Sequence, residues 1–301
     1  MNAIEIKDLT KTYKTGTRAL KGVDLAVGEG DFFALIGANG AGKTTIIGIL
    51  TGLVNKTTGT VSVFGHDIDS DFANAKRMLG VVPQEFNFNM FENVQDIVVN
   101  QAGYFGVPHK TATKDAEGIL KRVGLWEKRK AMARTLSGGM KRRLMIARAL
   151  IHHPRMLILD EPTAGVDVEL RRGMWDYLRE VNAQGTTILL TTHYLEEVEQ
   201  MCKNAAIIKE GNIVRNDTVR NLVAFMPQDT YCITVKDMQA LWPLQDYKPV
   251  SVDGNVIEIE IQQREQLNDV LMKMIQAGFV ITDVHPKGNR LEKLFLQILK
   301  T

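Results

Sequence analysis

The sequence has little cysteine and almost no excess of charge. Its only cysteines, Cys202 and Cys232, are too few and too far apart for a zinc motif or a disulfide framework. We therefore expect a protein that resides in a reducing cytosol. The 37 basic and 35 acidic residues leave a net charge of +2, which gives no broad attraction to nucleic acid or acidic lipid. No apolar run approaches the roughly 18 residues that span a bilayer, and the start lacks the apolar core of a signal peptide. We expect a chain that does not cross a membrane alone.

Internal repeats and low-complexity tracts are also absent, and a length of 301 residues suits about two globular domains. We predict an α/β first domain over residues 1–218. It opens with short strand-like runs separated by glycines, which indicate an antiparallel β subdomain. Residues 85–135 carry apolar residues at helical intervals, which predicts an inserted helical subdomain. The very apolar runs MLILD and TTILLTT are typical of parallel strands buried on both faces.

A second unit is predicted over residues 219–301, where strands and helices alternate in a fresh series. We expect a small α+β accessory domain without catalytic residues, because it shows no glycine-rich or metal-ligand pattern. A regulatory or dimer-stabilising role is the hypothesis for it. Its long helix, which ends before Gly278, places a core-packing stripe on one face, made of Leu267, Val270, Leu271, Met274 and Ile275.

A glycine-rich turn between a strand-like run and a helical pattern matches the phosphate-loop motif G-x-x-x-x-G-K-[ST]. Its glycines let backbone N–H groups turn toward phosphate oxygens, and the helix N-terminus adds partial positive charge. Lys43 would reach the outer phosphates and Thr44 would bind Mg²⁺. The sequence therefore predicts a nucleotide site made of Gly37, Asn39, Gly40, Ala41, Gly42, Lys43, Thr44 and Thr45.

The run MLILDEP ends an apolar strand in two carboxylates, and the phosphate loop decides what they mean. We predict that Asp160 holds Mg²⁺ through water and that Glu161 accepts a proton from the attacking water. Together with LSGGM at residues 136–140, these motifs make residues 1 to about 220 resemble the nucleotide-binding subunit of an ATP-binding cassette (ABC) transporter, with a P-loop NTPase core. Within that family, the segments PQEFNFN and LSGGMKRRLMIARAL most resemble the separate ATPase subunits of bacterial multidrug and polysaccharide exporters.

The resemblance also assigns roles to further residues of the nucleotide site that lie in the same chain as the phosphate loop. It implies that Gln84 is the Q-loop glutamine, which serves both catalysis and Mg²⁺, and that Tyr13 stacks on adenine. It implies that His193, after the core strand TTILLTT, is the switch histidine that positions the transition state. ATP and Mg²⁺ are the expected cofactors.

The resemblance also implies that the signature LSGGM acts on a second copy of the chain. Ser137 would cap its helix and, with Gly138 and Gly139, donate to the γ-phosphate on the partner; Asp167 of the D-loop AGVD belongs to the same trans set. Two copies would pair head to tail around two ATP molecules. The implied function is ATP hydrolysis that powers export through a separate membrane permease, at the cytoplasmic face of a bacterial inner membrane.

The rival class is a soluble ABC ATPase acting on nucleic acid or ribosomes, which would share every catalytic motif. A long coiled coil, zinc elements or a second ATPase unit would favour it, and the sequence has none of these. A module that only senses nucleotide would be expected to lack Glu161 or His193. The basic run at residues 141–143 is interpreted as the solvated side of the signature helix, with nucleic-acid contact as the alternative.

Overall fold

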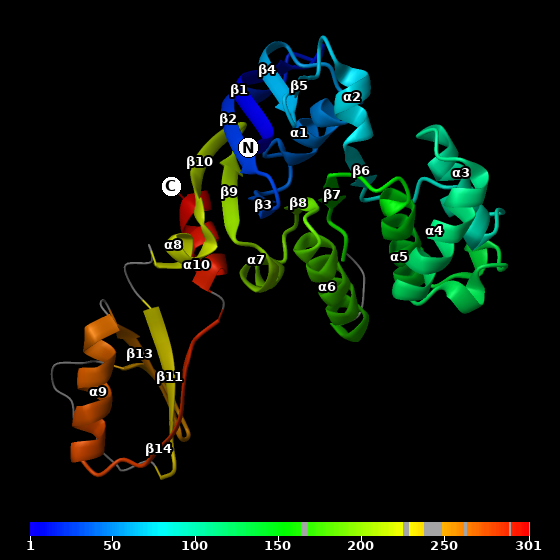
Figure 1. Cartoon of the computed structure of the whole chain (residues 1–301). Coiled ribbons are helices and arrows are strands. Elements are labelled where there is room, and N and C mark those ends of the chain that lie inside the picture. Colours follow the sequence, from blue (N-terminus) through cyan, green and yellow to red (C-terminus); the bar gives the residue numbers. More distant parts are fainter. Residues whose placement is uncertain (164–167, 225–228, 238–248, 262–263, 289, 301) are drawn as a thin grey trace. The chain divides into compact units, whose positions relative to one another are not determined.

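The computed structural model describes residues 1–163, 168–224, 229–237, 249–261, 264–288 and 290–300 (Figure 1). The chain divides into two compact units, Met1–Val219 and Arg220–Thr301. Among the described residues, none of the helices combines the length and the apolar character that a bilayer crossing requires.

The first unit begins with an antiparallel sheet in the strand order β2-β1-β4-β5, as predicted. Its strands are β1 (Asn2–Thr12), β2 (Arg18–Gly28), β4 (Thr58–Val63) and β5 (His66–Asp67). Apolar and polar residues alternate along β2, so that Val23, Leu25 and Val27 are buried while Asp24 is exposed. One face of the sheet therefore belongs to the core.

A six-stranded sheet in the order β10-β9-β3-β8-β7-β6 forms the centre of the unit. Its strands are β3 (Phe32–Ile36), β6 (Leu79–Val82), β7 (Met156–Asp160), β8 (Thr187–Thr191), β9 (Asn204–Lys209) and β10 (Asn212–Thr218). All neighbours are parallel except β10, which forms a hairpin with β9. Every residue of β3, β7 and β8 is buried, which for β7 and β8 confirms the prediction of strands covered on both faces.

Helices and the antiparallel sheet cover this central sheet. The antiparallel sheet and α1 share one hydrophobic core with Phe33 and Leu35 of β3 and Ile158 of β7. The helices of this part are α1 (Lys43–Leu50), α2 (Phe72–Arg77), α6 (Val168–Ala183) and α7 (Leu195–Met201). Since β3, β6, β7 and β8 run parallel, the residues that follow them gather at one edge of the sheet, where sites form in such folds.

The inserted helical subdomain has a hydrophobic core of its own. It contains α3 (Val94–Tyr104), α4 (His109–Arg122), the short 3₁₀ turns Trp126–Lys128 and Ala133–Thr135, and α5 (Gly138–Leu150). Figure 1 shows α3, α4 and α5 together as one helical group. Helix α5 packs on α3 and α4 and also on β6, so it joins this subdomain to the central sheet.

The second unit is an antiparallel sheet with a helix on one face. Its elements are α8 (Val219–Ala224), β11 (Asp229–Val235), β12 (Pro249–Asp253), β13 (Val256–Ile261), α9 (Arg264–Gln276), β14 (Ile281–Pro286) and α10 (Arg290–Lys300). The strand order is β12-β13-β11-β14. Val270 and Met274 of α9 are fully buried in its core. The predicted stripe is wrong for Ile275, which is 60% exposed and lies outside the core that Val270 and Met274 join.

Candidate active site

The phosphate loop between β3 and α1 has two positions that only glycine fits. Gly42 caps α1 with a φ of +117°, and a Cβ there would lie 2.8 Å from Leu20 Cδ2 and 3.0 Å from the Ala19 oxygen. A Cβ on Gly37 would lie 2.6 Å from the Ile208 oxygen. The loop is thus packed tightly against β2 and β9, while Asn39 and Gly40 at its tip are exposed.

Lys43 is the first residue of α1, and its side chain is buried within the loop. Its Nζ donates to the carbonyl oxygens of Gly37, at 2.7 Å, and Ala38, at 3.1 Å. Burial lowers the pKa of Lys43, whereas the nearby carboxylates of Glu161 and Asp160 raise it. The ammonium group is therefore placed inside the loop and toward the acidic edge of β7.

The two carboxylates at the end of β7 are held differently. Asp160 is buried and pairs in register with Thr191 of β8, whose Oγ1 donates to Asp160 Oδ1 at 2.5 Å. Glu161 has a φ of +49°, an uncommon backbone conformation for a residue other than glycine. Its N–H still donates to the Thr191 oxygen at 2.9 Å. The chain therefore leaves the sheet at Glu161, the predicted general base.

Three of the predicted catalytic side chains meet at the carboxylate of Glu161. Gln84 Nε2 donates to Glu161 Oε2 at 3.3 Å, and His193 Nδ1 lies 3.3 Å from the same oxygen. These residues follow β6, β7 and β8, which are neighbours in the sheet. Glu161 is largely buried, whereas half of the His193 side chain is exposed. The structure thus brings together a carboxylate, an amide and an imidazole at one edge.

Tyr13 lies beside the start of α1. Its hydroxyl is 3.2 Å from Thr45 Oγ1, and Lys11 Nζ lies 4.9 Å from the centre of its ring. The phenol ring is partly exposed. An aromatic face next to the phosphate loop is what a stacked base requires.

The signature segment begins α5. Ser137 caps the helix, and its Oγ accepts a hydrogen bond from the Met140 N–H at 3.3 Å. Ser137 and Gly138 are exposed, whereas Gly139 is buried. Among the described residues, no hydrogen bond joins this segment to the phosphate loop. Asp167 lies outside the described residues.

Comparisons with known proteins identify the family. The sequence profile described as "ABC transporter" matches residues 20–164. The linearmycin resistance ATP-binding protein LnrL of Bacillus subtilis is 32% identical over 98% of this chain and 97% of that protein. The chain belongs to the ABC transporter ATP-binding family. The Nod factor export ATP-binding protein I of Burkholderia thailandensis is 38% identical to this ABC protein, over 73% of the chain and 72% of the relative.

Solved structures place the first unit among ABC ATPase cassettes. A dimeric cassette, MJ0796 bound to ADP and Pi in a post-hydrolysis state, is 27% identical with a TM-score of 0.67, over 72% of this ABC protein and 99% of that chain. The ATP-binding subunit of another ABC transporter has a TM-score of 0.68 at 26% identity, over 74% of this chain and 92% of its own. The ABC protein therefore binds ATP and is an ATPase with the P-loop fold.

Two residues of this ABC protein's site escaped the sequence analysis. Thr191 holds Asp160, and only the register of β7 with β8 reveals it. The interpretation of residues 141–143 as a solvated face is wrong for Arg142, which is 5% exposed. Its guanidinium donates to the oxygens of Pro83, at 3.0 Å, and Gln84, at 2.9 Å. Arg142 stands three residues after buried Gly139 and three before buried Met145, a helical spacing that could have indicated its burial.

Proposed function

We propose that this chain is the ATP-hydrolysing subunit of an export-type ABC transporter. The observation that carries the proposal is the convergence of Gln84 and His193 on Glu161, beside the buried ammonium group of Lys43. The relative LnrL, which matches this chain over nearly the whole length of both proteins, is named for resistance to linearmycin. The Nod factor protein is named for export. These names favour an exporter over a soluble ATPase acting on nucleic acid or ribosomes.

The residues of the first unit divide the work of ATP hydrolysis. Glu161 takes a proton from the attacking water, because its carboxylate lies at the edge of the central sheet where the γ-phosphate of bound ATP would be placed. His193 and Gln84, which both contact Glu161 Oε2, position the water and the transferring phosphoryl group. Lys43 neutralises charge on the outer phosphates, the loop from Gly37 to Thr45 donates its backbone N–H groups, and the ring of Tyr13 stacks on adenine.

The residues present also fit Mg²⁺. Thr44, exposed at the start of α1, offers a hydroxyl, and Asp160 offers a carboxylate whose other role is to accept from Thr191. Gln84 uses its amide nitrogen toward Glu161, so its amide oxygen is the atom available to a metal. Such oxygen donors suit Mg²⁺, which when bound would neutralise charge on the phosphates.

The signature glycines support a second copy of the chain as partner. A Cβ added to Gly138 would meet no atom within 4 Å, so packing within the chain does not explain a residue that weakens a helix. An approaching phosphate would explain it, because Ser137, Gly138 and Gly139 offer donors at a helix N-terminus. We infer a head-to-tail dimer in which these residues, with Asp167, complete the partner's ATP site. The dimeric MJ0796 cassette offers the structural precedent.

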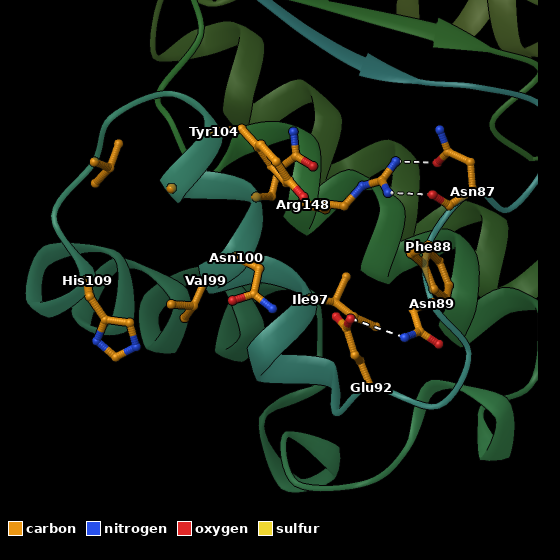
Figure 2. Close-up of a pocket in the computed structure, with 13 residues that line it drawn as sticks. Asn87, Phe88, Asn89, Glu92, Ile97, Val99, Asn100, Tyr104, His109 and Arg148 are labelled. Carbon is orange, nitrogen blue, oxygen red and sulfur yellow. Dashed lines mark hydrogen bonds between the residues drawn. The ribbon is translucent and has the colours of Figure 1, made fainter.

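An integral membrane permease would complete the transporter, and the chain would bind to its cytoplasmic face. A pocket of about 580 Å³ is lined by residues of the segment 87–89, α3 and Arg148 (Figure 2). On its rim Tyr104 is 86% exposed, and nearby in sequence Phe91 is 69% exposed. Exposed aromatic rings are a suitable contact surface for a permease. A permease bound there would lie beside the segment that follows Gln84 and could shift that catalytic residue.

Purification of the tagged full-length chain from detergent-solubilised membranes of its host tests this function. We expect an integral membrane protein to co-purify and the complex to hydrolyse ATP. Transport by that complex in vesicles should stop when Glu161→Gln replaces the normal chain. A chain that hydrolyses ATP but co-purifies with ribosomes or nucleic acid instead would favour the rival class.

The second unit is proposed to stabilise the dimer or to couple it to the permease. Its core involves only its own residues, and all nucleotide-site residues precede it. Deletion after Asn221 should therefore leave the ATP dissociation constant within about twofold, because no phosphate contact is removed. Calorimetry with ATP and size-exclusion chromatography should show retained binding and weaker self-association. Loss of ATP binding in a folded truncation would contradict this division of labour.

A further inference from the structure

Helix α5 holds the Q-loop segment, residues 83–89, with two arginines. Arg142 donates to the oxygens of Pro83 and Gln84 through two different nitrogens. Arg148, farther along the helix, donates to the oxygen of Asn87 at 3.1 Å and to its side chain (Figure 2). Each guanidinium also lies over an aromatic ring of the same segment, Arg142 at 5.1 Å from Phe86 and Arg148 at 5.9 Å from Phe88.

Arg142 is the member of this pair that contacts a predicted catalytic residue, because it donates to the backbone oxygen of Gln84. It is buried, and its Nε has no hydrogen-bond partner among the described residues, so its burial carries a cost that a surface arginine avoids. Burial lowers the pKa of Arg142, and the charges of Asp160 and Glu161 act in the opposite direction. A buried guanidinium that donates to the backbone oxygens of Pro83 and Gln84 is placed to hold the backbone from which the Gln84 side chain extends.

The same helix begins at the signature. Ser137 is its N-cap and Arg142 lies five residues later, about one and a half turns along α5. In the proposed dimer, Ser137 serves the ATP held by the partner, whereas Gln84 serves the ATP held by its own chain. Arg142 therefore connects the helix that contacts one ATP to the glutamine that contacts the other.

We propose that Arg142 is a positioning residue that ties the signature helix to the Q loop, sets Gln84 against Glu161, and so couples the two composite ATP sites. The inference rests on the proposed dimeric function. Lysine cannot replace this arginine, because a single ammonium group on a flexible stem does not reproduce a planar fork that donates to two adjacent carbonyls.

The test uses the full-length variant Arg142→Lys, which keeps the charge. We expect kcat to fall by about 10²-fold, since small misplacements of catalytic groups cost this much, while the ATP dissociation constant changes less than twofold. In a Gln84→Ala background, Arg142→Lys should lower kcat by less than threefold, because Arg142 acts through Gln84. Hydrogen exchange of backbone amides in residues 84–88 should become faster in Arg142→Lys.

Arg143→Lys is the matched control. Arg143 is the next residue of α5 and donates to a backbone oxygen, that of Val123, 2.8 Å away in the helical subdomain. The variant Arg143→Lys should leave kcat and the hydrogen exchange of residues 84–88 unchanged. Equal kcat values for Arg142→Lys and the unmodified chain, or full additivity with Gln84→Ala, would overturn the inference. An unmodified chain that fails to hydrolyse ATP would instead contradict the proposed function.

Discussion

Glu161→Gln is expected to leave ATP binding intact and to reduce turnover by about 10²- to 10⁴-fold, the usual contribution of a general base. The amide keeps the shape of the carboxylate and can still meet Gln84 and His193, but it does not accept the proton of the attacking water. Nucleotide should therefore be held without being consumed. Steady-state ATPase assays and calorimetry measure the two quantities separately.

The same variant should accumulate as an ATP-bound dimer. Size-exclusion chromatography with ATP and Mg²⁺ should show a dimer peak for Glu161→Gln that the unmodified chain loses as it hydrolyses ATP. Glu127→Gln, at an exposed position of the helical subdomain, is the control and should retain normal turnover. A Glu161→Gln chain that binds ATP and stays monomeric would contradict the closed dimer.

Lys43→Ala is expected to weaken nucleotide binding itself, by about 10- to 100-fold, which corresponds to the loss of one charged hydrogen-bonding group. Its ammonium group is the buried cation of the phosphate loop and lies near two carboxylates. Titration of ATP into the variant measures the dissociation constant. Lys130→Ala, at an exposed position, is the control. An ATP affinity equal to that of the unmodified chain would refute the role of Lys43.

Much of the site could be predicted because it depends on local patterns that the fold brings together in one way. The apolar runs before Asp160 and His193 are buried parallel strands, and parallel neighbours end at one edge. With a phosphate loop in the same domain, the carboxylates at the end of the first of these strands predicted Glu161 as the general base. The resemblance to ABC ATPases added Gln84, Tyr13 and the signature, and the signature acts between two chains.

The residues that escaped prediction depend on contacts between elements distant in the sequence. Arg142 donates to carbonyl oxygens about sixty residues away, and although its helical spacing could have indicated burial, the basic run does not reveal which oxygens it contacts. Thr191 supports Asp160 only through strand register. Ile275 fits the apolar period of its helix, yet the sheet covers too little of that helix to bury it.

The account depends most on the claim that each ATP site is completed by a second copy. A chain with Ser137→Arg retains Lys43 and Glu161, whereas a chain with Glu161→Gln retains the signature, so a mixed dimer has one intact composite site. Each variant alone should be nearly inactive. Equal mixing should restore about a quarter of normal ATPase activity, if half the dimers are mixed and each has one working site. Mixed dimers that stay as inactive as their parents would mean strict coupling of the two sites or a site completed within one chain, and crosslinking position 137 to the partner's phosphate loop separates these cases. Inactive mixed dimers in which that crosslink does not form would contradict the claim.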